Sequence, residues 1–145
     1  MYFLEEISKL FIEVCPSDVG TPFLSIDEAK LLTLEEDIEI GSHTKTHKML
    51  TSLKEDDQID EIVGGHKDLE HMLDHKINYF AYPFGGRKHF DSVSQRIVGG
   101  VNKVTAFSAY GGTNMALDRL DVKRITVSED AIRTLKRKIL YSNKY

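Results

Sequence analysis

Two histidines separated by three residues are the feature of this 145-residue sequence best suited to chemistry. His43 and His47 lie in the string 41–47, directly after the strand-like alternation of residues 38–40. Two imidazoles this close on a turn can converge on one divalent ion, and zinc is a common partner of nitrogen ligands. A catalytic zinc site also needs a third protein ligand and an open position for water. The spacing therefore predicts a metal site at His43 and His47 and leaves its third ligand open.

The other four histidines favour structural or solvent-exposed roles. His71 and His75 have the same spacing as the first pair, but they follow a helical pattern among charged neighbours, which is typical of a solvated face. His66 falls on the apolar side of the same helix and is predicted to be partly buried and hydrogen-bonded. His89 is predicted to lie on the surface. Spacing alone is a weak signal, so only the context of the first pair distinguishes it.

A second loop, at residues 83–87, follows the next predicted strand. The segment 77–82 is rich in β-branched and aromatic residues and is stopped by Pro83 and the glycine pair that follows. Taken alone, residues 82–86 are also typical of a simple β-turn with buried aromatic side chains. In α/β folds, chemistry gathers in loops after the carboxyl ends of parallel strands. The loops at 41–47 and 83–87 are both expected there.

The elements that position these loops alternate along the chain, which favours an α/β fold with a largely parallel sheet or barrel. Ser25 and Glu28 predict a capping box at the start of a helix whose Ile26, Ala29 and Leu32 face the core. The longest helix is expected at about 54–74, with a kink or close contact at its two internal glycines. The remaining predicted elements are helices at 2–10, 91–98 and after 128, and strands at 11–14, 38–40, 77–82, 103–108 and 122–127.

Composition bounds the class of protein. A chain of this length predicts a single domain over residues 1–145, and a net charge of −4 gives no reason to expect a nucleic acid partner. The one cysteine, Cys15, cannot form an internal disulfide, and no apolar run approaches the length of a membrane span. Residues 1–6 lack the pattern of a signal peptide, so a cytoplasmic location is the default expectation and the compartment is left open.

The strings 38–50 and 80–85, in this order and at this distance, resemble the polysaccharide deacetylase (NodB-homology) family. The resemblance implies a partial or irregular (β/α) barrel and a hydrolase that removes acetyl groups from an N- or O-acetylated carbohydrate. It implies that His43 and His47 are ligands of a divalent metal, expected to be zinc. It also implies that the backbone N–H of Phe84 is catalytic, as a donor to the oxyanion.

The same resemblance makes Tyr82, Pro83 and Gly85 substrate-binding residues, in one wall of the groove. The chemistry is coherent, since a Lewis-acidic ion polarises an acetamide carbonyl while a fixed N–H stabilises the tetrahedral intermediate. Ala81 stands where family members with the fuller pattern carry an arginine, and no histidine after His89 offers a general acid.

The family's first motif, a strand ending in Thr-Phe-Asp-Asp, has no counterpart in this chain. Asp18, Asp27 and Asp37 precede the histidines, but none follows the required strand, so none is assigned a catalytic role. The expected fold therefore lacks its first strand, and the segment 11–14 matches the family's second. In the family, one aspartate of this motif is the general base and the other is the third metal ligand. Zinc is therefore expected to bind more weakly here, and loss of a general base typically costs about 10²–10⁴ in rate.

Two consequences stay open at this stage. The chain is either a metal-dependent deacetylase impaired by the missing aspartates or a non-catalytic remnant of the same fold that binds a glycan or a protein. An exposed sheet edge would also invite pairing with a second copy, which makes a homodimer a reasonable hypothesis.

Overall fold

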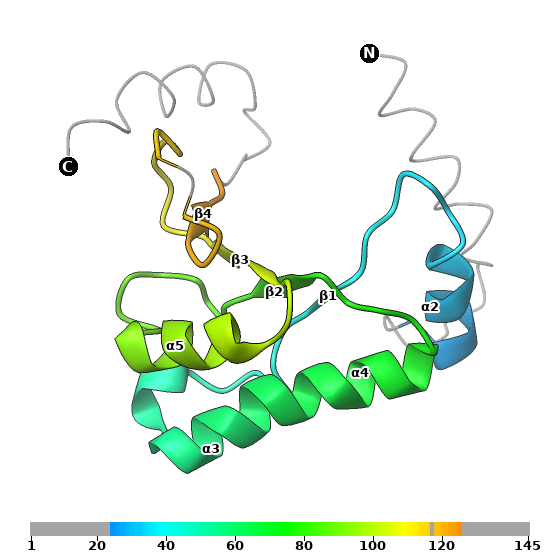
Figure 1. Cartoon of the computed structure of the whole chain (residues 1–145), viewed down its shortest axis with the longest axis horizontal. Coiled ribbons are helices and arrows are strands. Elements are labelled where there is room, and N and C mark those ends of the chain that lie inside the picture. Colours follow the sequence, from blue (N-terminus) through cyan, green and yellow to red (C-terminus); the bar gives the residue numbers. More distant parts are fainter. Residues whose placement is uncertain (1–23, 117, 126–145) are drawn as a thin grey trace.

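The computed structural model describes residues 24–116 and 118–125. Helices and strands alternate through this part of the chain, and one long helix runs below the strands in the view of Figure 1. In chain order the elements are α2 (Ile26–Leu32), β1 (Gly41–Ser42), the 3₁₀ turn η1 (Leu50–Ser52), α3 (Glu55–Ile59), the π-helical segment η2 (Asp60–Gly64), α4 (Gly65–Leu73), β2 (Tyr79–Ala81), α5 (Ser92–Gly100), β3 (Thr105–Ser108) and β4 (Val122–Lys123).

The strands form one parallel sheet in the order β1-β2-β3-β4. Its register places Gly41 beside Tyr79, and Phe80 beside Ala106. Over the described ranges the sheet is open, with β1 and β4 at its edges. The predicted α/β class with a parallel, incomplete barrel-like sheet is confirmed.

The long predicted helix is present as an unbroken run from α3 through η2 to α4, over residues 55–73. Its buried positions repeat with helical periodicity, but several of them are polar. The buried positions are Gln58, Glu61, Ile62, Gly65, His66 and Leu73. Ile59 and Met72, which the periodicity assigns to the core, are about two-fifths exposed, at 41% and 42%. The helix thus turns a partly polar stripe toward the rest of the protein, and each polar member has a hydrogen-bond partner.

The core lies between this helix, α5 and the inner face of the sheet. Tyr82 is its largest fully buried side chain; its ring stacks on Phe90 at 3.9 Å and its hydroxyl donates to the carbonyl of Leu120 at 2.9 Å. The cluster of buried residues also contains Leu50, Ile62, Phe80, Ile97, Val98, Val104 and Ala106. Since the core extends to the residue directly after β2, it supports the start of the second candidate loop.

Two expectations for the early elements need correction. The strand predicted at 38–40 is found at Gly41–Ser42, where the backbones approach so closely that a Cβ on Gly41 would lie 3.1 Å from the Cβ of Tyr79. The capping box of α2 is confirmed, but the helix has no buried residue, and Ile26 is 51% exposed.

The remaining predictions for the elements fare as follows. The helix at 91–98 and the strands at 77–82 and 103–108 are present with shifted ends, as α5, β2 and β3. The expected helix at 2–10, strand at 11–14 and helix after 128 lie outside the described residues, as does the end of the strand predicted at 122–127. Among the residues that the structure describes, none of the helices is long and apolar enough to cross a membrane.

Candidate functional site

The two candidate loops meet at the carboxyl edge of the sheet. His43 directly follows β1, Tyr82 directly follows β2, and these strands are paired neighbours. Parallel strands end at the same edge, so the loops that leave them lie side by side. The ring of His47 accordingly lies against the ring of Phe84, with centroids 4.8 Å apart.

His43 is held in a defined orientation and tautomer. Its Nδ1 lies 2.7 Å from the carbonyl oxygen of Ala81, and because a carbonyl can only accept, the proton resides on Nδ1. The lone pair of Nε2 is therefore free on an exposed side chain. A histidine that ligates a metal commonly donates its other ring N–H to a carbonyl in this way.

His47 lies beside His43, with ring centroids 4.8 Å apart and ring planes at 70°. Its backbone is in the left-handed region, with φ of 59°, as is that of Thr44, with φ of 65°. The N–H of His47 donates to the Thr44 hydroxyl at 3.1 Å, which closes a tight turn between the two rings. Left-handed backbone is unfavourable for such residues, so contacts from outside the turn must hold it.

Glu61 supplies those contacts from the helix below. Its carboxylate accepts the backbone N–H groups of Lys45 at 3.1 Å and of Thr46 at 2.8 Å, and the Thr46 hydroxyl as well. Lys48 lies 3.7 Å away, while the Glu61 side chain is only 5% exposed. Burial alone would raise the pKa of this carboxyl, but the hydrogen bonds from Thr46 and Lys45 and the charge of Lys48 outweigh it and lower the pKa. Glu61 is therefore ionised and fastens the histidine loop to the helix.

The same helix carries a glycine where the loop passes over it. A Cβ on Gly65 would lie 2.8 Å from the backbone nitrogen of Lys45 and 2.9 Å from the carbonyl carbon of Thr44. The close contact expected at the internal glycines is thus present, and its partner is the histidine loop.

The second loop is a left-handed turn centred on Phe84 and Gly85. Their φ angles are 60° and 61°, and a Cβ on Gly85 would lie 2.7 Å from the Cβ of Ala109. The Phe84 side chain is 57% exposed. Within residues 24–116 and 118–125, the backbone N–H of Phe84 has no hydrogen-bond acceptor. The turn thus presents an exposed ring and a free amide beside His47.

Tyr82 and Pro83, which the resemblance makes substrate-binding residues, lie directly before the Phe84 turn. Both side chains are buried, because the Tyr82 ring is stacked in the core and Pro83 follows it inward. They support the turn from behind, and Phe84 is the exposed side chain of this segment.

His89 is a residue that sequence reasoning placed differently. It was expected on the surface, yet it is half-buried, and its ring lies 5.3 Å from that of Phe84, on the Phe84 side of the site. Its Nδ1 accepts the backbone N–H of Gly86 at 3.0 Å, and the backbone N–H of His89 donates to the Gly86 carbonyl at 2.9 Å. The glycine pair before it was the available signal, since a Cβ on Gly86 would lie 2.9 Å from the His89 ring.

The remaining histidines take no part in the two candidate loops. His66 is 4% exposed and pairs with the Ser42 hydroxyl at 2.9 Å, which confirms the buried, hydrogen-bonded role predicted for it. His71 and His75 are both exposed, as predicted, but His75 lies beyond the end of α4 and does not share its helical face.

The donor set at the carboxyl edge fits part of a zinc site. Ligand nitrogens lie about 2.0–2.1 Å from zinc, a distance that two rings as close as those of His43 and His47 can share. Over the described ranges, no third histidine, cysteine, aspartate or glutamate joins a cluster able to hold a metal ion. Asp27 and Asp37, which were assigned no role, are exposed and lie before β1.

The fold and the loop geometry define an α/β domain whose site is built from loops after adjacent parallel strands. Residues 26–97 match the family described as "Polysaccharide deacetylase". The polysaccharide deacetylase (NodB-homology) family is therefore shown for this segment, just under half of the chain, which contains both loops and the helix between them. The resemblance proposed from the two strings is confirmed.

Solved structures support the same fold. The deacetylase PplD of Streptococcus pyogenes, in complex with acetate, aligns with a TM-score of 0.67 and 18% identity over 83% of this chain and 53% of its own. A de-N-acetylase from Aggregatibacter actinomycetemcomitans aligns with a TM-score of 0.67 and 15% identity over 86% of this chain and 58% of its own. A polysaccharide deacetylase from Bacillus cereus aligns with a TM-score of 0.60 and 24% identity over 74% of this chain and 34% of its own.

The chain thus spans between about a third and three-fifths of the length of these structures. None of the curated proteins matches the sequence.

Proposed function

We propose that this domain acts on acetylated carbohydrate as a metal-dependent deacetylase, with His43 and His47 as two ligands of a zinc ion. The observation that carries the proposal is the juxtaposition of the two rings with the Phe84 turn at one edge of the sheet. The family match supports deacetylation as the reaction class. In this reaction, an N-acetyl group and water are converted to an amine and acetate.

The protein groups in this site would divide the work. His43 donates its Nδ1–H to the Ala81 carbonyl, so its Nε2 would be the atom that binds the metal. When bound, zinc would supply Lewis acidity and lower the pKa of water. The free N–H of Phe84 would donate to the oxyanion of the tetrahedral intermediate, and the exposed Phe84 ring and the close-packed Gly85 would shape the groove.

Zinc binding tests the metal site directly. Calorimetric titration of wild type, His43→Ala and His71→Ala is expected to show binding lost in His43→Ala and retained in His71→Ala, a matched exposed histidine. Equal binding by all three proteins would exclude the proposed ligands.

Acetate release tests the reaction. N-acetylglucosamine oligomers are the first substrate, assayed with zinc, with a chelator, and after zinc is restored. Slow turnover that depends on zinc and disappears in His43→Ala supports the deacetylase. Zinc binding with no acetate release would instead assign these residues to a glycan-binding or protein-binding domain of the same fold.

A further inference from the structure

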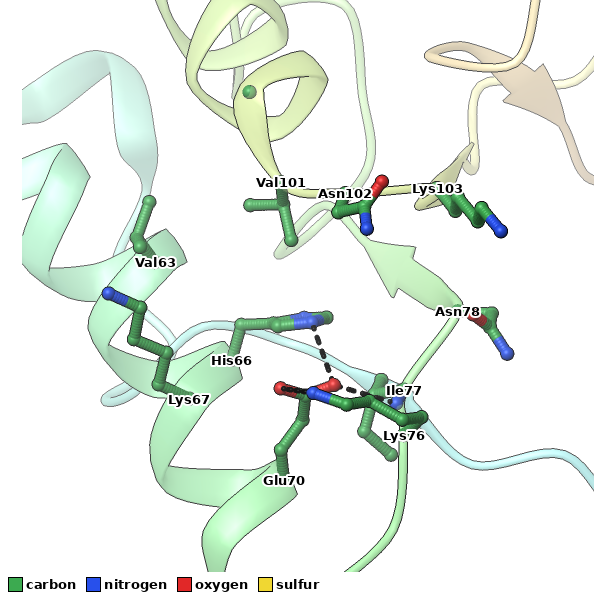
Figure 2. A pocket seen from close by; sticks show the side chains of 11 residues that line it. Val63, His66, Lys67, Glu70, Lys76, Ile77, Asn78, Val101, Asn102 and Lys103 are labelled. Carbon is green, nitrogen blue, oxygen red and sulfur yellow. Dashed lines mark hydrogen bonds and ion pairs between the residues drawn. The ribbon is translucent and has the colours of Figure 1, made fainter.

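A cavity of about 560 Å³ lies at the opposite end of the sheet from the histidine pair. Asn78 immediately precedes β2, and Lys103 lies two residues before β3, so the cavity is at the amino ends of these strands. It lies between α4 and the turn that joins α5 to β3 (Figure 2). Small-molecule sites commonly have volumes of about 300–1,000 Å³, so its size is adequate for a metabolite.

The cavity has apolar walls and one buried polar face. Its apolar lining consists of Val63 from the long helix, Ile77 from the segment before β2, and Val101 from the turn after α5. On the helix side, His66 and Glu70 are one turn apart, with His66 Nε2 3.9 Å from the carboxylate. Burial lowers the pKa of His66, although the charge of Glu70 opposes that effect, so its ring is neutral at pH 7.

The carboxylate of Glu70 is already compensated. It accepts the backbone N–H of Ile77 at 3.2 Å and pairs with the Lys76 ammonium at 3.2 Å. Burial would raise the pKa of Glu70, but these hydrogen bonds and the Lys76 charge outweigh it and lower the pKa, so the carboxylate is ionised. Glu70 and Lys76 together contribute no net charge to the cavity.

Two further ammonium groups border the cavity without such compensation. Within the described part of the chain, Lys67 and Lys103 have no ion-pair partner, and the side-chain amides of Asn78 and Asn102 have no hydrogen-bond partner. Figure 2 shows Lys67 on the α4 side and Lys103, Asn78 and Asn102 on the side of the strands. The rim thus combines two uncompensated positive charges with two amides able to donate hydrogen bonds.

We propose that this cavity binds a small phosphate monoester, at a site separate from the histidine loops. A phosphate monoester carries a charge of about −1.5 to −2 at pH 7, which the ammonium groups of Lys67 and Lys103 would balance. The two amides supply further donors to its oxygens, and the apolar walls accommodate a compact organic body. The proposal does not depend on the deacetylase function.

An NMR titration of the isotopically labelled chain tests this site. The probes are inorganic phosphate and glucose 6-phosphate, with glucose as the uncharged control. Both phosphates are expected to cause saturable shifts at the amides of residues 66–70, 76–78 and 100–103, whereas glucose is not.

The variant Lys67→Gln/Lys103→Asn removes both free charges. Asparagine is chosen because Lys103 has a φ of 58°, a left-handed conformation that asparagine tolerates well. Affinity for glucose 6-phosphate should fall at least about tenfold, while Lys30→Gln, an exposed lysine on α2, should bind as wild type. Zinc binding should be the same in all three proteins.

Several results would overturn the proposal. They are the absence of saturable shifts with either phosphate, shifts confined to the histidine loop at 43–48, and an unchanged affinity in the double variant. If the double variant does not fold, Lys67→Gln alone decides the question: weaker binding supports the site and unchanged binding refutes it.

Discussion

Replacement of Glu61 should loosen the histidine loop without touching either histidine. Glu61→Ala leaves the N–H groups of Lys45 and Thr46, and the Thr46 hydroxyl, without their acceptor. Hydrogen bonds to a charged group contribute about 1.5–3 kcal/mol each, but these three share one carboxylate and are not additive. We expect the free energy of unfolding to fall by about 2–4 kcal/mol, because three donors lose a charged acceptor that they share.

Glu61→Gln should be milder. Its amide oxygen can still accept both backbone N–H groups and its NH₂ can donate to the Thr46 hydroxyl, so the expected loss is about 1–2 kcal/mol. The matched control is Asp60→Ala on the same helix. Asp60 also reaches the loop, through Lys45 at 3.4 Å, but its side chain is 68% exposed, and such a pair contributes about 0–1 kcal/mol.

Urea unfolding and zinc titration measure the two effects separately. Since His47 depends on the turn that Glu61 fastens, zinc affinity in Glu61→Ala should fall about 10- to 100-fold, the usual effect of losing a group that supports a ligand. A loss of less than about 1 kcal/mol in stability, together with unchanged zinc affinity, would refute this account. The loop would then hold its left-handed turn without the helix.

Two more predictions concern the same edge of the sheet. Because the pKa of Glu61 is lower in the folded protein than the ordinary value of 4.5, its stabilising contribution is complete above that pH and is lost as the pH falls through the lowered value. Urea unfolding from about pH 6 to pH 3 should therefore show that the difference in free energy of unfolding between wild type and Glu61→Gln becomes smaller at acid pH. A difference that stays constant would contradict the stabilising role of the ionised Glu61. Gly85→Ala should lower the free energy of unfolding more than Gly111→Ala. Both glycines have positive φ, which costs an alanine about 1–2 kcal/mol, but only the new Cβ at position 85 would clash, at 2.7 Å from the Cβ of Ala109. Thermal unfolding of both variants measures the difference, and equal losses would show that the clash is relieved at no cost.

The local sequence pattern was enough to predict several elements of the fold. The Ser25–Glu28 capping box, the helix capped by Asp91 and the long helix over 55–73 all follow from short-range spacing and are present. The pairing of a histidine string with a later proline turn was also enough to indicate the family, because loops after adjacent parallel strands must meet at one edge.

The supports of the candidate site could not be read from the same pattern. Glu61 looks like any acidic residue of an exposed helix, and its role becomes visible only when the helix lies under a loop some fifteen residues away. His89 is similar, since its contact with Phe84 depends on how the turn folds back.

Sequence by itself determined the α/β class, most helix positions and the residues that could bind a metal, because periodicity and capping are properties of neighbouring residues. Tertiary structure decided that Tyr82 is buried while Phe84 is exposed, that β1 begins at Gly41, and that a buried carboxylate holds the turn between His43 and His47. Those outcomes depend on contacts between segments distant in the chain, whose packing and hydrogen bonds override local preference.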